Sequence, residues 1–272
     1  MPNVIGCVDC THISIIRPLM HDTERPPRLY INRKKFYSLN VEATVDSDLI
    51  FTSVNPKFPG ATHDSGIWMK SPVRNHMKKE FLRNREQHIV LGDKGYPLEP
   101  FIFTPYPTPE TDNQERFNRL HEQARNTIER SFGVLKAVFR CLLKHRVLHY
   151  KPVIAGKITN ACFTLYNYMR RNGYNFDQIE GVNEEFENDI ALNDGELYRI
   201  GLERRETYIS ALVLASSNEK NSLTEFLECT QSSDSPKEHP QKMFYGFVRR
   251  FPELAALVAG NCQNTWKSKY LL

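Results

Sequence analysis

Three acidic residues occupy positions where the surrounding sequence is apolar or helical, and their chemistry is the natural starting point. Asp9 interrupts an apolar run near the start of the chain, and Asp93 follows the apolar run 88–91 after one glycine. Glu129 lies close to the apolar face of a segment with helical spacing. A carboxylate on a core element is costly unless it is paired or binds a metal. The three acids therefore predict one inward-facing cluster, which repels itself unless divalent cations neutralise it.

The identity of the expected cation follows from the ligand type. Carboxylate oxygens are hard ligands, and they favour Mg²⁺ or Mn²⁺ over zinc. Each acid taken singly also has a structural interpretation, as a helix cap or as one half of a salt bridge. The three acids alone do not distinguish a metal site from these structural roles.

Two cysteines raise a competing chemistry. Cys7 and Cys10 form a Cys-x-x-Cys pair, which is typical of zinc and redox sites, but the sequence has no second such pair and no Cys-x-x-His. On a strand the two side chains point to opposite faces. We therefore favour two core cysteines.

The elements that must position the acids follow an α/β order. The predicted strands span 4–16, 36–45, 49–54 and 88–91, and the predicted helices span about 62–81, 113–145 and 153–170. The second and third strands should form a hairpin, and Pro56 and Pro59 should break the chain after it. A loop is expected over 97–113. This order is that of a ribonuclease-H-like α/β domain, a mixed sheet flanked by helices, although other α/β folds share it.

Composition divides the chain into four parts. The predicted parts are a domain over 4–172, an acidic extension over 173–215, a flexible linker over 216–242 and a short helical tail over 243–272. The extension holds the segment 177–196, which has eight acidic residues and no Lys or Arg. The linker is rich in Ser, Glu, Lys, Asn and Pro, a composition that disfavours a packed core.

The charge distribution has two explanations. The net charge is +4, and residues 112–157 carry ten Lys or Arg against four Asp or Glu. A basic segment beside an acidic one fits a face that holds a polyanion. The alternative is two solvated faces of opposite sign, and charge alone favours that plainer interpretation. The sequence shows neither a membrane-length apolar run nor a signal-peptide pattern. Its six cysteines do not make a disulfide scaffold in a chain of this length, so we expect an intracellular, reducing compartment.

Five blocks of sequence carry a more specific signal. They are 6–13 (GCVDCTHI), 32–41 (NRKKFYSLNV), 59–65 (PGATHDS), 91–98 (LGDKGYPL), and 116–119 with 125–136 (RFNR and RNTIERSFGVLK). In these blocks the chain resembles the DDE-type transposases of the PIF/Harbinger superfamily and the nuclease-like proteins derived from them. Because the five blocks occur in the family's order over about 4–170, the resemblance is highly specific.

The resemblance implies a two-metal nuclease site. Asp9, Asp93 and Glu129 correspond to the catalytic acidic triad and to metal ligands for Mg²⁺ or Mn²⁺, with Asp9 bridging both ions. Asp64 corresponds to a further acid at the metal site, although a helix-cap role is also open to it because a helix should begin nearby. The implied substrate is DNA.

Five basic residues complete the implied site. The resemblance places Arg125, Arg130 and Lys136 on the DNA backbone side of the long helix. His12 and His63 lie near the acids in sequence, where we expect them to support the metal ligands rather than to transfer protons.

The resemblance leads to an expected function with one alternative. We expect a nuclear, metal-dependent DNA endonuclease that does not transpose by itself, because family members carry a helical DNA-binding region before the first catalytic strand and Asp9 lies near the start here. A separate DNA-binding protein would then supply target recognition. The alternative is a domesticated module that binds DNA or protein without cutting. A defunct transposon fragment is less compatible with the regular apolar pattern through residue 170.

Overall fold

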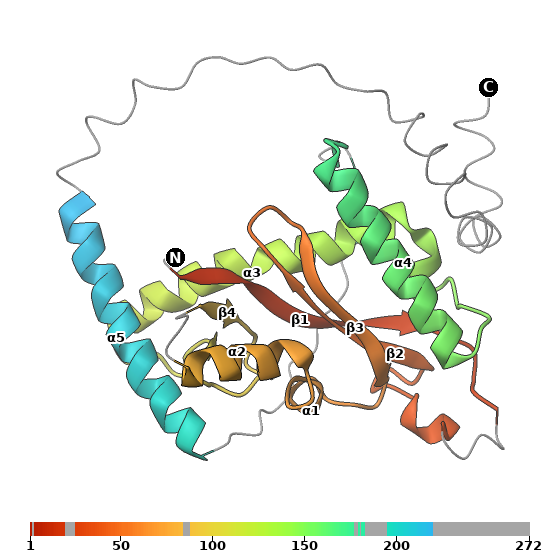
Figure 1. Ribbon diagram of the computed structural model, residues 1–272, viewed down its shortest axis with the longest axis horizontal. Helices are drawn as coiled ribbons and strands as arrows, with labels where there is room; N and C mark the ends of the chain where they lie inside the picture. The colour runs from red at the N-terminus through yellow and green to blue at the C-terminus, as the bar shows by residue number, and fades with distance from the viewer. Residues whose placement is uncertain are drawn as a thin grey trace.

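A mixed five-stranded sheet forms the centre of the computed structural model, which describes residues 1, 3–19, 25–83, 88–176, 179, 181–182 and 195–219 (Figure 1). The strands are β1 (Val4–Ser14), β2 (Ser38–Val45), β3 (Phe51–Pro59), β4 (Ile89–Leu91) and β5 (Ile102–Phe103). Their spatial order is β3-β2-β1-β4-β5. The first three strands pair antiparallel, whereas β4 and β5 continue the sheet in parallel with β1.

Helices cover both faces of this sheet. They are α1 (Asp64–Trp68), α2 (Pro72–Leu82), α3 (Asp112–Val138), α4 (Pro152–Arg171) and α5 (Gly195–Glu219), with short 3₁₀ turns at Pro27–Leu29 and Arg140–Leu142. One apolar core lies between the sheet and α3, α4 and α5, and a second lies between the sheet and α1 and α2. Cys7 belongs to the first core and Cys10 to the second, as strand alternation predicts. The ribonuclease-H-like α/β prediction is thereby confirmed.

Four details of the predicted elements are wrong. The third strand continues through Pro56 and Pro59, because β3 is an edge strand and edge positions tolerate residues without an N–H. The single helix over 62–81 is two helices, since Pro72 begins α2 and the Ser71 side chain caps it by accepting from the Val73 N–H. The expected loop over 97–113 contains the short strand β5. The long helix ends at Val138 and is followed by a 3₁₀ turn.

The helix α5 packs against the domain. Arg205 donates to the Thr104 carbonyl over 2.8 Å, and the Tyr106 hydroxyl donates to Glu206 over 2.7 Å. The rings of Tyr208 and Phe103 meet edge to face. The described helix thus covers the β5 end of the sheet (Figure 1). It includes the last part of the predicted acidic extension and runs four residues into the predicted linker, 216–219. Most of that linker and the helical tail predicted over 243–272 lie outside the described residues.

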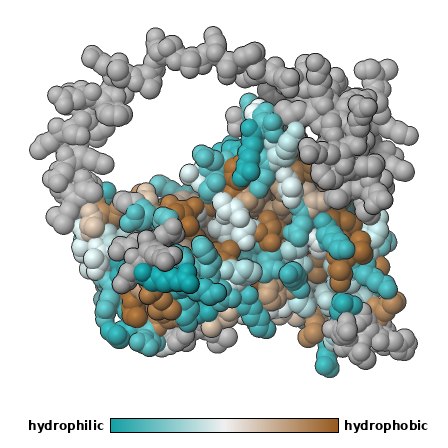
Figure 2. All heavy atoms as spheres, in the orientation of Figure 1, coloured by the Kyte–Doolittle hydropathy of each residue, from teal (hydrophilic) through white to brown (hydrophobic). Residues whose placement is uncertain are grey.

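The surface of the described part is polar over the face shown in Figure 2, with apolar side chains in scattered patches. None of the described helices combines the length and apolar character needed to cross a membrane.

Candidate active site

An open edge on β1 creates the candidate site. β1 pairs with β2 over Cys7–Ser14, whereas β4 accompanies it only as far as Cys7. Beyond Cys7 the side of β1 that faces away from β2 has no neighbouring strand among the described residues until the bridge between Ile15 and Leu148. Asp9 lies at this opening, and Asp93 follows β4 at the point where β4 ends.

Asp9 is held by two hydrogen-bond donors. Its Oδ1 accepts from the Cys10 N–H over 2.8 Å, and its Oδ2 accepts from Arg125 Nη2 of α3 over 2.6 Å. The Asp9 side chain is only 5% exposed. A buried carboxylate that accepts from a guanidinium is fixed in orientation, because the charged hydrogen bond is strong and directional.

Asp93 and Asp64 approach the same region from other elements. Asp93 accepts from the Gly95 N–H over 2.9 Å, in the turn after β4. Asp64 is the first residue of α1, and it accepts from Asn40 Nδ2 of β2 over 2.9 Å. The N-cap of α1 is His63, not Asp64. The bond to β2 directs the Asp64 carboxylate toward the sheet.

All three aspartates have raised pKa values. The pKa of Asp9 is raised to about 7, chiefly by burial; Arg125 opposes the rise, while Asp93 and Asp64 add to it. Burial likewise raises the pKa of Asp64 and of Asp93. These carboxylates share an environment that disfavours their negative charge, and a cation would relieve that cost.

Glu129 reaches the cluster from α3. Its Oε1 lies 3.6 Å from Arg125 Nη2, the same nitrogen that donates to Asp9. Because both oxygens contact this nitrogen, the distance between Asp9 Oδ2 and Glu129 Oε1 cannot exceed the sum of the two contact distances, 2.6 and 3.6 Å. The Glu129 side chain is 36% exposed, so this acid is more accessible to solvent than Asp9.

The basic residues on α3 separate into three environments. Arg125 lies among the acids, so in this arrangement it neutralises carboxylates instead of meeting a phosphate. Lys136 is completely buried and donates to the Thr11 hydroxyl over 2.7 Å, which anchors α3 to β1 and leaves no surface for DNA. Arg130 is exposed and is electrostatically coupled to Tyr166 of α4, away from the acids.

The two histidines lie outside the acid cluster. His12 alternates to the opposite side of β1 from Asp9 and bonds through Nδ1 to the Ser38 hydroxyl, 3.1 Å away. Burial lowers the pKa of His12 to about 4, so its ring is neutral at pH 7. His63 is exposed and bonds through Nδ1 to Arg33.

One further buried acid lies beside the cluster and was missed by reasoning from sequence. Glu42 lies opposite Cys10 in the β1–β2 ladder and is 2% exposed. Burial raises its pKa to about 7, and Asp64 adds to the rise. The signal was available in the sequence, because Glu42 interrupts an apolar strand just as Asp9 does.

The donor set fits a hard divalent cation, although the acids do not surround a common point in this arrangement. Within the described residues, no three His, Cys, Asp or Glu side chains stand close enough to form a ready metal cluster. The Arg125 guanidinium, which contacts both Asp9 and Glu129, is the cation between them. The carboxylate oxygens of Asp9, Asp64, Asp93 and Glu129 are nevertheless the ligands that Mg²⁺ and Mn²⁺ prefer.

Comparison with known proteins identifies the family of this chain. A family model described as DDE superfamily endonuclease matches residues 8–167, which contain all four predicted acids. The chain belongs to the DDE superfamily endonucleases. The Harbinger-type resemblance is confirmed by relatives named "Putative nuclease HARBI1": the Mus musculus protein is 32% identical and the Homo sapiens protein 30% identical, each over 64% of this chain and 48% of the relative.

More distant relatives extend the comparison to plants. An Arabidopsis thaliana protein named "Protein ALP1-like" is 27% identical over 52% of this chain and 37% of its own length. No solved structure matches. The chain spans about half the length of the HARBI1 relatives. The matched region of this DDE endonuclease domain therefore contains the acid cluster, the Arg125 pair and the strands that position them.

The position of Arg125 leads to a prediction about metal affinity. We expect Arg125→Gln to lower the melting temperature of the metal-free protein, because Asp9 and Glu129 lose their cation. The same change should enlarge the rise in melting temperature that Mn²⁺ causes, because the ion no longer competes with a guanidinium. Thermal unfolding in EDTA and in a Mn²⁺ series measures both effects.

The matched control is Arg125→Lys, which keeps the positive charge and should respond less. If Mn²⁺ stabilises the wild type and Arg125→Gln equally, Arg125 does not occupy the cation position.

Proposed function

We propose that this chain hydrolyses DNA phosphodiester bonds with Mg²⁺ or Mn²⁺ bound by Asp9, Asp93 and Glu129, and with Asp64 at the same site. The observation that carries the proposal is the buried Asp9 at the open edge of β1: Asp64 and Asp93 raise its pKa, and one guanidinium contacts both Asp9 and Glu129. An ion-pair network that served stability alone would not require Asp64 and Asp93 near Asp9, where both raise its pKa.

In this proposal the acids hold the metal ions, and neighbouring hydrogen-bond donors orient the acids. Bound divalent ions supply an activated water and stabilise the leaving oxygen of an in-line displacement. Asp9 is prepared to ligate because the Cys10 N–H fixes one of its oxygens. Gly95 orients Asp93, and Asn40 orients Asp64. Lys136 keeps β1 and α3 in register by its bond to Thr11.

The proposal extends to the cellular location, the partner, the domain bounds and the DNA contacts. We propose a nuclear location, because the proposed substrate is DNA, and a separate DNA-binding protein that selects the target. The proposed nuclease domain spans 4–172. Arg130 stays in the proposal as an exposed contact to the DNA backbone, whereas Lys136 does not.

A second candidate function is a module that binds DNA or protein without cutting. The observation that favours it is the ion pair itself, because Arg125 already neutralises Asp9 at 2.6 Å and contacts Glu129. A non-cleaving protein would keep this pair closed whether or not divalent ions are present.

A cleavage assay with an Asp64 variant separates these functions. We expect the wild type to cut supercoiled plasmid and labelled oligonucleotides with Mn²⁺ and not with EDTA. Asp64→Asn should fold normally but cut about ten- to a hundred-fold more slowly, the scale of losing a group that supports a metal site. A purely structural role would leave cleavage unchanged, because Asn keeps an oxygen that can accept the hydrogen bond from Asn40.

The matched control is Asp48→Asn, which makes the same change in the exposed turn before β3 and should be silent. Wild-type protein that binds DNA but cuts no substrate with either ion would establish the non-cleaving alternative.

A further inference from the structure

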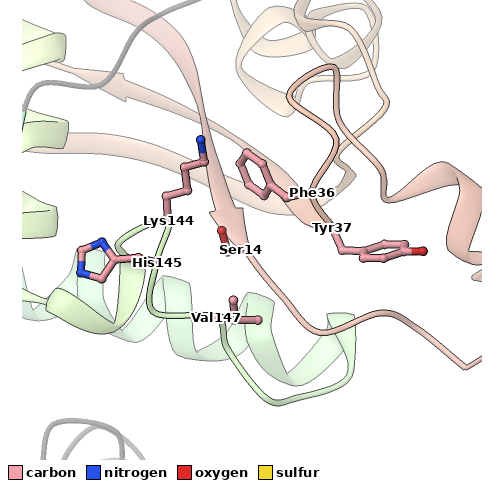
Figure 3. Close-up of a pocket in the computed structure, with 6 residues that line it drawn as sticks. All are labelled: Ser14, Phe36, Tyr37, Lys144, His145 and Val147. Atoms are coloured by element: carbon pink, nitrogen blue, oxygen red, sulfur yellow. The ribbon is translucent and has the colours of Figure 1, made fainter.

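A groove runs from the acid cluster along β1 to a small aromatic pocket. The groove has a volume of about 760 Å³, and its lining includes Asp9 and Asp64 at one end and Phe36 and Lys144 at the other. The pocket beyond it has a volume of about 280 Å³ and is lined by Ser14, Phe36, Tyr37, Lys144, His145 and Val147 (Figure 3). Because Phe36, Lys144 and His145 line both hollows, the two form one continuous surface.

The charges along the groove change from negative to positive. Apart from Asp9 and Asp64, the ionised lining residues are basic: Arg28, Arg33, Lys34, Lys35 and Lys144. A metal-loaded acid end and a basic far end both attract phosphates, so a polyanionic strand complements the full length of the groove. Ser14 lies five residues beyond Asp9 on β1, roughly 17 Å at strand spacing. A few nucleotides of one strand span this distance.

The pocket itself presents aromatic rings beside cations. Phe36 and Tyr37 are half-buried, and the Lys144 ammonium lies 5.1 Å from the centroid of the Phe36 ring. The His12 ring supports Phe36 edge to face from β1. Figure 3 shows Phe36 and Lys144 reaching toward the same space above Ser14. A ring with a nearby cation is the combination with which proteins bind an unstacked base and its phosphate.

The turn that carries Phe36 is rigidly built. Asn32 is 3% exposed, and its side chain accepts from the Phe36 N–H and donates to the Ser38 hydroxyl. Lys35 has a positive φ of 62°, a conformation that non-glycine residues seldom adopt and that surrounding contacts must hold. The Phe36 ring is therefore preorganised at the groove, which lowers the entropic cost of binding there.

We propose that this pocket binds an unstacked base of a single DNA strand whose backbone follows the basic groove toward the acid cluster. A paired duplex would present only phosphates and sugars to the rings, whereas an unpaired base offers a face for stacking. The proposal rests on the proposed nuclease function for its direction along the groove. The pocket volume lies just below the roughly 300 Å³ lower end for drug-sized ligands, which suits one base rather than a longer segment.

Photocrosslinking in EDTA tests the proposal without cleavage. A single-stranded oligonucleotide that carries 5-iododeoxyuridine is irradiated with the full chain, and the attached peptide is identified by mass spectrometry. We expect attachment at Phe36 or Tyr37. Phe36→Leu, which keeps an apolar side chain but no ring, should weaken single-strand binding about ten-fold, and Phe36→Tyr should restore it. Tyr168→Leu removes an exposed ring on α4 and should leave binding unchanged.

A second variant keeps the test decisive if Phe36→Leu folds poorly. Lys144→Gln alters an exposed side chain and should weaken single-strand binding several-fold, while Lys157→Gln on α4 should not. Crosslinks confined to other segments, equal affinity for duplex and single strand, or unchanged binding by Phe36→Leu would overturn the proposal. A protein that crosslinks at Phe36 yet never cuts refutes only the nuclease proposal, and one that cuts without this crosslink refutes only the base pocket.

Discussion

Asp9→Asn is expected to abolish metal-dependent cleavage while the protein stays folded. Asn keeps the shape of the side chain and can still accept from the Cys10 N–H, but it lacks the charge that holds a dication. Metal ions contribute several kcal/mol to stabilising charge in a phosphoryl transition state. Since each 1.36 kcal/mol is a factor of ten in rate, we expect a loss of about a thousand-fold or more.

Two readouts make this prediction specific to the site. Cleavage of labelled DNA with Mn²⁺ measures the rate, and thermal unfolding with and without Mn²⁺ measures binding. The wild type should gain stability from Mn²⁺ by mass action, and Asp9→Asn should gain much less. In EDTA the variant should melt near the wild type, because Arg125 can still pair with Glu129. Cleavage within ten-fold of wild type would remove Asp9 from the catalytic machinery.

The acids could be predicted from the sequence because a buried acid stands among apolar neighbours along the chain. Asp9 and Asp93 stand in or beside apolar strands, and Glu129 lies near an apolar helix face, so each was visible as a costly residue that needed a partner. The five sequence blocks that resemble the family then predicted that the three acids share one site. Glu42 shows the same pattern as a further buried acid, since it too interrupts a strand whose neighbours are apolar.

The partner of each charge was not visible, because partners meet across the fold. Arg125 and Asp9 are 116 residues apart, and only the packing of α3 on β1 brings them within 2.6 Å. Arg125 precedes Glu129 by four residues on α3, but this spacing does not show that the guanidinium also pairs with Asp9. Lys136 was misplaced for the same reason, since its bond to Thr11 spans 125 residues and hides it from solvent.

The predicted strand boundaries were wrong where the position of a strand in the sheet decides whether its residues are tolerated. Pro56 and Pro59 disrupt a central strand but fit an edge strand, and the sequence does not state which strand is at the edge. The short strand β5 lies in a proline-rich stretch, and its place in the sheet depends on pairing with β4 and on α5 packing above it.

A buried ion pair in that same stretch fixes α2 and the helix α1, which begins at Asp64. Glu99 is completely buried and accepts from Trp68 of α1 over 2.9 Å and from Arg74 of α2, with 2.6 Å to its Nη2. The Arg74 side chain is only 6% exposed. One carboxylate therefore joins the segment before β5 to both helices on this face of the sheet.

We expect Glu99→Ala to be the most destabilising change outside the acid cluster. It leaves the Arg74 guanidinium buried without its carboxylate and the Trp68 N–H without an acceptor, a loss of about 3–5 kcal/mol. For a domain of this size the melting temperature should fall by about 10 °C, at roughly 2–4 °C for each kcal/mol. Because α1 begins at Asp64, metal-dependent cleavage should also weaken below the unfolding transition.

Glu203→Ala, which breaks the exposed Arg199–Glu203 pair on α5, is the matched control and should cost less than about 1 kcal/mol. The double change Arg74→Leu with Glu99→Leu should recover much of the loss, because no buried charge is then left without a partner. A melting temperature for Glu99→Ala within 2 °C of wild type would show that this ion pair does not hold α1 and α2 in place.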